Sequence, residues 1–278
     1  MCMTGGHLRT RVRSTVAVGL LLAALPCAAM VGLGPVARAD TGLAPLDAPI
    51  ERYRSRLIED VDRSVMSVQK LRASVANGDL AAARQAWIEA RVGWERSEVF
   101  TSGFAPELDR DIDAWPNGAT GFHAIEAKLF GADRIDIASE VDALLHSLSA
   151  MATTTRKITL TPQGLLDGLT RLAYEVGESK VDGGESRISG TSIDDMRNNV
   201  DGIELAYGTI FAAAIESCDR NLHATAQHQI DELKTMLAQR DLRQIEQERL
   251  RVVSEELVLT LQTAAPEIAL ARPTLELQ

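Results

Sequence analysis

The sequence predicts an all-α protein built from up-and-down helical bundles. Apolar residues recur three or four positions apart along several long segments, which is the spacing that places them on one face of an α-helix. Runs of Val, Ile and Thr of the kind that form strands are missing, and aromatic residues make up only 4% of the chain. Polar stretches with Gly, Asn and Asp separate the helical segments, so each element can be taken in chain order.

Residues 1–39 are expected to be an export signal that is removed from the mature protein. Three arginines precede an apolar stretch over residues 15–33, and Ala37-Arg-Ala39 is a small–x–small cleavage site. Pro26 interrupts the apolar stretch and disfavours a membrane anchor. Cys27 could be a lipidation site, but a proline directly before the cysteine fits such a site badly. We therefore expect an exported protein, periplasmic or otherwise extracytoplasmic, without a lipid anchor.

The mature domain, expected to span residues 40–278, is strongly acidic. The chain has 29 basic and 39 acidic residues, and the signal contains four arginines and no acid, which leaves a net charge of −14. Such a surface repels nucleic acid and anionic lipid headgroups and attracts cations. The charge therefore excludes nucleic acid as an expected partner and permits metal capture.

Two long helices are expected to open the mature domain. The apolar spacing predicts the first over residues 48–75, and Asn77-Gly-Asp79 ends it. The second is expected over residues 80–100. Trp87 and Trp94 lie on its apolar stripe, where packing in the core is the default role of a large aromatic side chain.

Turn and capping signals delimit the remaining helices. Residues 101–117 contain three aspartates and two prolines and are expected to form a loop. Thr120, Thr161 and Thr191 are expected N-caps, the last of them in a capping box with Asp194. The helices that follow are expected over residues 120–130, 136–157, 161 onward, 191–217, 222–239 and 242–264.

Cys218 is the one cysteine outside the expected signal, so the mature chain can form no intramolecular disulfide. The apolar core must therefore hold the domain together. The alanine-rich helical surroundings of Cys218 predict a buried, unreactive thiol.

Two pairs of possible metal ligands lie on neighbouring predicted helices. His123 and Glu126 are three residues apart, as are Glu95 and Glu98, and this spacing places both members of a pair on one helical face. An imidazole and carboxylates so arranged can bind one cation, as they do in metal-binding helix bundles. The loop between the helices adds a further acid. We therefore expect a cation site formed by His123, Glu126, Glu98 and Asp113, with Glu95 as a fifth ligand or as a partner of a ligand.

The same spacing recurs elsewhere, so spacing alone does not single out a site. His228 and Asp231 repeat the His–acid pair, and Glu175 and Glu178 repeat the double acid. Solvated pairs on helix surfaces would explain all of these without a metal.

Four segments in a fixed order provide the distinction. Trp94-Glu-Arg-Ser-Glu98 has the pattern aromatic-x-x-x-Glu, Ile112-Asp-Ala-Trp-Pro116 contains Asp-Ala-Trp-Pro, and Gly121-Phe-His-Ala-Ile-Glu126 has the pattern G-x-H-x-x-E. The fourth segment is the polar stretch 183–202. Over residues 45–240 the chain therefore resembles the imelysin-like proteins, and the fourth segment resembles the loop and helix start of their EfeM/EfeO branch.

The resemblance implies both a fold and a function. The implied fold has two helical lobes around a long shared helix, with the signature near the cleft between them. The EfeM/EfeO branch implies an extracytoplasmic component of a ferrous/ferric iron uptake system, which delivers metal to a membrane permease and works with a haem peroxidase. The chain resembles the short form, which lacks an N-terminal cupredoxin domain. Iron is the expected ion, and zinc, manganese or copper are the alternatives.

Other functions stay open. Imelysin-like proteins have been called metallopeptidases, but a zinc peptidase helix of the His-Glu-x-x-His type supplies two histidines, and the segment here supplies only His123. One imidazole among carboxylates suits iron or manganese, so no enzymatic activity is expected. The chain could instead bind another ligand, such as a polysaccharide bridged by a cation, or serve as a structural bundle. Gly190 stands where many relatives have a histidine, which implies a weakened second metal site.

Overall fold

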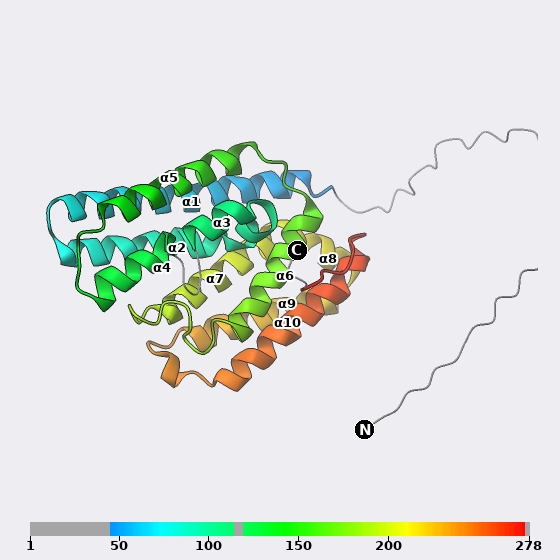
Figure 1. Cartoon of the computed structure of the whole chain (residues 1–278). Coiled ribbons are helices and arrows are strands. Elements are labelled where there is room, and N and C mark those ends of the chain that lie inside the picture. The colour runs from blue at the N-terminus through cyan, green and yellow to red at the C-terminus, as the bar shows by residue number, and fades with distance from the viewer. Residues whose placement is uncertain (1–44, 114–118, 276–278) are drawn as a thin grey trace, which may run out of the picture. The chain divides into compact units, whose positions relative to one another are not determined.

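The computed structural model describes residues 45–113 and 119–275, which lie in one compact helical unit (Figure 1). No strand occurs in these ranges, so the all-α prediction is confirmed. None of their helices combines the length and the apolar composition that a membrane span requires. The expected export signal with Cys27 lies outside the described residues. The α-helices are α1 (Asp47–Ala76), α2 (Leu80–Phe104), α3 (Pro106–Ile112), α4 (Gly121–Glu126), α5 (Ala138–Lys157), α6 (Pro162–Glu178), α7 (Ser192–Ala206), α8 (Ala212–Cys218), α9 (Arg220–Leu237) and α10 (Gln247–Glu267).

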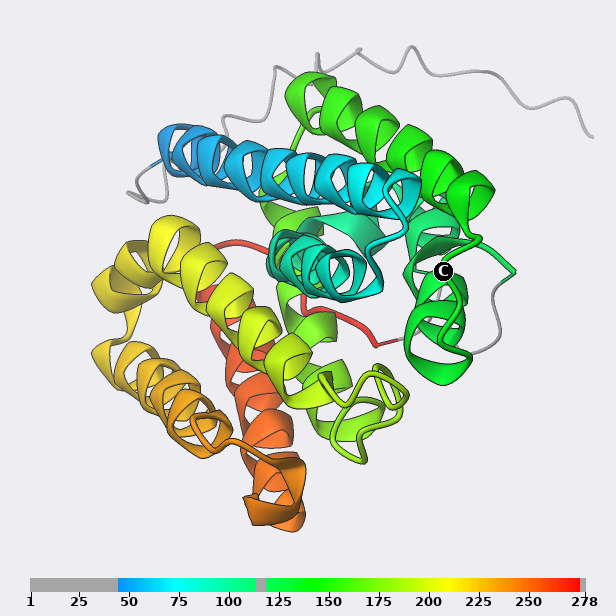
Figure 2. The ribbon, with the colours of Figure 1, turned by 90° about the vertical axis from the view of Figure 1, so that its left-hand side faces the viewer.

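The helix α2 lies between two groups of helices. On one side it packs against α1, which in turn packs against α5; on the other side it packs against α6 and α7. The helices α9 and α10 pack outside α6 and α7, and the view along α2 shows the two groups on either side of it (Figure 2). The shared long helix expected from the resemblance is therefore α2.

Glycines allow the helices to approach α2 closely. A Cβ atom added at Gly93 of α2 would lie 2.1 Å from a backbone carbonyl oxygen of α1. A Cβ added at Gly168 of α6 or at Gly202 of α7 would lie 2.0 Å or 2.5 Å from a carbonyl oxygen of α2. A larger residue at any of these positions would force the helices apart. This close packing buries the middle of α2 on several sides.

The tryptophans of α2 are core residues, as the sequence predicts. Trp87 and Trp94 are both fully buried. The indole Nε1 of Trp87 also donates a hydrogen bond to the backbone carbonyl oxygen of Phe122, at 3.1 Å. The aromatic stripe therefore packs the core and also fixes α4 against α2.

The expectation of a loop over residues 101–117 is wrong in part. The helix α2 continues to Phe104, and α3 forms directly after it. A proline at the start of α3 and two acids in its first turn favour a helix there. Glu98 consequently lies before the last turn of α2. The helix dipole, which disfavours carboxylates in a last turn, therefore has little effect on it. Asp113 is the residue that ends α3.

The three expected threonine caps differ in outcome. The hydroxyl of Thr161 accepts a hydrogen bond from the backbone N–H of Gly164 at 3.2 Å, as expected. Thr120 and Thr191 precede α4 and α7 but make no capping hydrogen bond, so the predicted capping box is wrong. The hydroxyl of Thr191 instead lies 2.9 Å from the hydroxyl of Ser189, within the loop before α7.

The segment expected as one helix over residues 191–217 consists of α7, a π-helical turn over Tyr207–Phe211, and α8. Cys218 is the last residue of α8 and is exposed, so the prediction of a buried thiol is wrong. The chain turns there into α9, whose first N–H groups are capped by Asp219. The thiol therefore lies at a turn on the surface and outside the packed part of the helix.

Candidate metal centre

Three charged side chains of α2 face the interior of the protein. Arg91, Glu95 and Glu98 are separated by three or four residues and therefore share one face of the helix. Arg91 and Glu95 are 1% and 0% exposed and form an ion pair. The helices packed on both sides of α2 remove this face from water.

The helix α4 is fixed by a glycine that no other residue can replace without strain. Gly121, the first residue of α4, has a φ angle of +74°. A Cβ atom there would lie 2.3 Å from the backbone carbonyl oxygen of Ile112. Only glycine tolerates both conditions, which explains the glycine of the G-x-H-x-x-E segment. Together with the hydrogen bond from Trp87, this close contact places His123 beside the end of α3.

His123 is held between two carboxylates. Its Nε2 atom lies 3.2 Å from Oδ1 of Asp113, and its Nδ1 atom lies 3.3 Å from Oε2 of Glu126. Burial by itself would lower the pKa of His123, but the charge of Asp113 and the hydrogen bonds that the ring donates to both carboxylates raise it to about 9. The imidazole is therefore protonated at neutral pH when no metal is bound.

Glu126 faces the loop between α6 and α7. Its Oε1 atom accepts hydrogen bonds from the backbone N–H and the hydroxyl of Ser189, at 2.8 and 2.7 Å. Burial would raise the pKa of Glu126, but the hydrogen bonds from His123 and Ser189 outweigh this effect and lower it. Both oxygens of Glu126 thus already have partners, and the carboxylate fixes the orientation of the His123 ring.

Four carboxylates meet beside His123. One oxygen from each of Glu95, Glu98, Asp113 and Glu185 lies within 4.8 Å of the other three. Asp113, His123 and Glu185 form a second group that satisfies the same limit. The sequence alone did not indicate Glu185, which comes from the loop between α6 and α7. We call these four acids and His123 the central cluster.

Two buried cations lie among these acids. The Nζ atom of Lys180 lies 3.1 Å from Glu95, 2.7 Å from Glu98 and 2.9 Å from Glu185. Burial would lower the pKa of Lys180, but the surrounding carboxylates hold it well above its ordinary value. The guanidinium of Arg91 forms ion pairs with Glu95, Asp113, Glu185 and Asp195.

Carboxylates outnumber the permanent cations in this region. Glu126, which pairs with His123, and Asp195, which pairs with Arg91, bring the mostly buried acids of this region to six. Burial raises the pKa values of Glu98 and Glu185; repulsion from Glu95 adds to this effect, and the charge of Lys180 opposes it. Burial also raises the pKa of Asp195 to about 7, against the lowering effect of Arg91. The metal-free centre therefore retains protons that a bound cation would displace.

Most of the expected ligands lie close together. The structure brings Glu95, Glu98, Asp113 and His123 together, whereas Glu126 is not among the groups that could share one ion. Sequence reasoning did not identify the other charged partners. Arg91 had a local signal, since it precedes Glu95 by four residues on the same helix. The remaining ones, Lys180, Glu185 and Asp195, belong to the loop before α7 and to its first turn.

The alternative His–acid pair lies on the surface. The side chain of His228 is 78% exposed, and its nearest acid is Glu232, with Nε2 and Oε2 3.9 Å apart. Asp231 accepts a hydrogen bond from Gln227. This is the geometry of a solvated helix face, as the sequence analysis expected.

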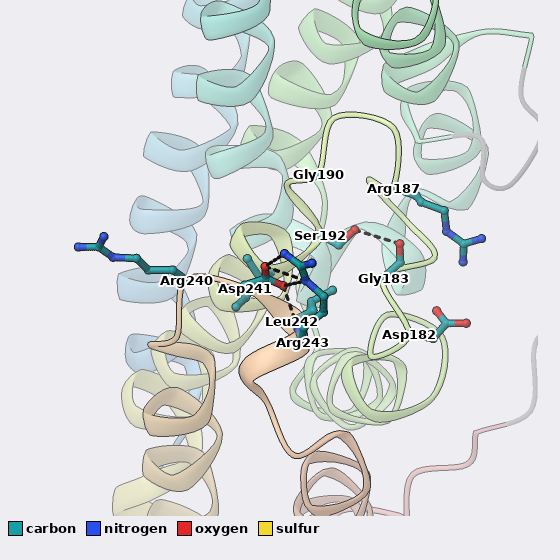
Figure 3. Close-up of a pocket in the computed structure, with 10 residues that line it drawn as sticks. Asp182, Gly183, Arg187, Gly190, Ser192, Arg240, Asp241, Leu242 and Arg243 are labelled. Carbon is teal, nitrogen blue, oxygen red and sulfur yellow. Dashed lines mark hydrogen bonds and ion pairs between the residues drawn. The ribbon is translucent and has the colours of Figure 1, made fainter.

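A pocket of about 160 Å³ opens beside the central cluster. It is lined by Glu98, Asp109, Asp113, Arg171, Glu175, Ser179, Lys180 and Glu185. A larger pocket of about 510 Å³ is lined by other residues of the loop between α6 and α7, by Ser192 and Ile193 of α7 and by residues 240–243 (Figure 3). There Arg243 is paired with Asp241, and the side chains of Arg187 and Arg240 point in opposite directions. The larger pocket therefore lacks converging charged groups, and the smaller one is the opening to the carboxylates.

The chain is similar to a known family and to named proteins. The family model for imelysin, which carries a peptidase label, matches residues 49–119 and 117–267. An iron uptake system component EfeM from Pseudomonas syringae is 29% identical over 215 residues, which are 72% of this chain and 75% of the relative. An EfeM/EfeO family lipoprotein from Staphylococcus haemolyticus is 27% identical over 209 residues, which are 70% of this chain and 71% of the relative.

A solved structure has the same fold. It is the crystal structure of a protein from Parabacteroides distasonis that is named as an iron-regulated protein A precursor. The two chains superpose with a TM-score of 0.58 and 18% sequence identity, over 82% of this chain and 93% of the other.

Proposed function

Since the chain belongs to the imelysin family, we propose that it binds a metal ion, iron, as the extracytoplasmic component of an iron uptake system. The names of the relatives from Pseudomonas and Staphylococcus support this role. The proposal includes delivery of the ion to a membrane permease and cooperation with a haem peroxidase, as the resemblance to the EfeM/EfeO branch implies.

The observation that carries the proposal is the surplus of buried carboxylates in the central cluster. Glu95, Glu98, Asp113 and Glu185 place oxygens within 4.8 Å of one another. Buried acids at such distances are costly unless a cation or protons neutralise them. Arg91 and Lys180 neutralise part of this charge in the metal-free protein, and a metal ion bound through the pocket beside Glu98 would supply more positive charge than the Lys180 ammonium does.

The proposed ligands are drawn from Glu95, Glu98, Asp113, Glu185 and His123. Glu126, which the sequence analysis expected as a ligand, is instead proposed to orient His123 through its Nδ1 atom. A carboxylate behind a ligating imidazole commonly plays this part in metal sites. Its hydrogen bonds with Ser189 support this assignment.

The donor set favours iron or manganese over softer ions. Carboxylate oxygens with one imidazole form a hard set, in which zinc and copper also bind but are not selected by ligand type.

The peptidase label of the family favours a second candidate, metal-dependent peptide cleavage. Within residues 45–113 and 119–275 no second histidine joins the groups that could hold an ion, so the usual ligand set of a zinc peptidase is lacking. We therefore propose binding and not catalysis.

The proposed location is outside the cytoplasmic membrane. The Staphylococcus relatives are named lipoproteins, so the names give no support to our expectation that Cys27 is not lipidated. Whether the exported chain is free or anchored does not alter the proposed metal site.

Metal titration tests the proposal. Purified protein is titrated with Fe²⁺ without oxygen, and with Mn²⁺, Zn²⁺ and Cu²⁺, by isothermal calorimetry. We expect one ion per chain and release of protons, because the site retains them when empty. Glu98→Gln and Glu185→Gln should each weaken binding at least about tenfold, which is about 1.4 kcal/mol. His228→Ala is the matched control and should bind as the wild type does; unchanged binding in both Gln variants would refute the site.

A further inference from the structure

We propose that Lys180 is a tethered counter-ion that occupies the metal position and must move out when an ion binds. It would thereby set which cations can enter the central cluster. The inference rests on the proposed function and extends it to the competition between the ion and the protein's own side chain.

The position of the ammonium group carries the inference. Its nitrogen lies within 3.1 Å of Glu95, Glu98 and Glu185, three of the four acids that could share one ion. Metal–oxygen bonds are about 2.0–2.2 Å long, so an ion bound to the same oxygens would lie in the space that the ammonium fills. The ion and the ammonium cannot both occupy this position among the three carboxylates, because two positive charges so close together repel strongly.

The second buried cation differs from Lys180 in its freedom to move. The guanidinium of Arg91 forms ion pairs with several acids and lies over the ring of Phe122, 5.2 Å from its centre. Arg91 also lies in the middle of α2, with 1% of its surface exposed. It is therefore fixed in place, and an entering ion can displace only Lys180.

Lys180 has an alternative position within reach. It follows the end of α6, and its side chain has four rotatable bonds, with the ammonium at the tip. The pocket of about 160 Å³ is lined by Lys180 and also by Asp109 and Glu175. The ammonium could move outward to these acids and remain paired while a metal ion takes its place.

The consequence is selection by charge. An entering ion must interact with the three carboxylates more favourably than the ammonium that it displaces. A monovalent ion gains no more from these oxygens than the ammonium does, whereas a divalent or trivalent ion gains more. The tethered charge also satisfies the acids when no metal is present, and so stabilises the empty protein.

The test compares Lys180→Met with Lys234→Met in the full exported chain. The second variant loses the same charge from a partly exposed lysine that pairs with Glu204 and Asp201, away from the central cluster. Mn²⁺ is the probe, and affinity and melting temperature are measured with and without it. We expect Lys180→Met to bind Mn²⁺ about tenfold more tightly or better. We also expect it to lower the melting temperature of the empty protein more than that of the loaded protein.

A lysine with only a structural role would behave differently. Its loss would lower both melting temperatures equally and leave affinity unchanged or weaker, and either result would overturn the inference while the proposed function stands. Binding by Lys180→Met when the wild type binds no Mn²⁺ would support the inference. Binding by neither would refute both proposals. Lys180→Gln serves as a second variant. If both metal-free variants lose their helical circular dichroism signal, recovery of that signal on adding Mn²⁺ supports the inference. Failure of the signal to recover contradicts it.

Discussion

The Nε2 atom of His123 lies 3.2 Å from the Oδ1 atom of Asp113, in a pair that is buried against α2. The pair changes the ionisation of both partners. The pKa of His123 rises to about 9, and the charges of Arg91 and His123 lower the pKa of Asp113 although burial acts in the opposite direction. Folding therefore stabilises the protonated imidazole in the metal-free protein.

The first prediction is a loss of stability of the metal-free protein at alkaline pH. Because the folded pKa of His123 is above the unfolded value of 6.5, its contribution is fully present below pH 6.5 and disappears as the pH rises through about 9. The melting temperature should fall between pH 6.5 and 9.5. His123→Gln should show a smaller fall over the same range, and parallel curves for the two proteins would contradict the buried pair.

The second prediction separates a ligand from a residue that orients one. Glu126→Gln keeps the shape of the side chain but removes the charge that faces Nδ1 of His123. If Glu126 orients the ring, affinity for Mn²⁺ should fall by about 10–100-fold, with one ion still bound. Ser189→Ala should have the same effect on a smaller scale, because Ser189 holds Glu126. Complete loss of binding in Glu126→Gln would identify Glu126 as a ligand.

Local patterns in the sequence predicted most of the helices and several members of the central cluster. The spacing of apolar residues predicted α1 and α2 to within a few residues, and the i, i+3 pairs indicated Glu95, Glu98 and His123. The partners of these residues depend on contacts between distant parts of the chain. Lys180 is 82 residues from Glu98, and Ser189 is 63 residues from Glu126, so no local pattern could show that they meet.

The error over residues 101–117 has a physical cause. An Asp-rich segment with two prolines was expected to be a loop, but a proline at the first helical position and acids in the first turn stabilised α3. The role of Glu126 stays a prediction. It was expected to bind the ion because it shares a helical face with His123, whereas the two hydrogen bonds that Ser189 donates to it led us to propose that it orients the His123 ring.

The third prediction concerns the packing of α6 on α2. A methyl group at Gly168 would lie 2.0 Å from a backbone carbonyl oxygen of α2, so Gly168→Ala must push the helices apart. We expect a loss of about 1–3 kcal/mol in the free energy of unfolding, measured by urea denaturation. Gly208→Ala is the control, because a Cβ there meets no atom within 4 Å. Equal stability of the two variants would mean that α6 does not approach α2 so closely.

The fourth prediction concerns export. The mature protein should begin at or near Asp40 and carry no lipid, because Pro26 disfavours lipidation of the following Cys27. Intact mass spectrometry of exported protein measures both features. A diacylglyceryl group on Cys27 would show that the chain is anchored, as the names of the Staphylococcus relatives suggest for those proteins.

The most direct test of the metal site is a crystal structure of the protein loaded with Mn²⁺ or iron, with the ion located by anomalous scattering. We predict one strong peak in the central cluster, in bonding contact with Glu98, Asp113 and Glu185. In that structure the ammonium of Lys180 should have moved out toward Asp109 and Glu175. A fully loaded crystal with no peak in the central cluster, or with its peak at His228 and Asp231, would contradict the account.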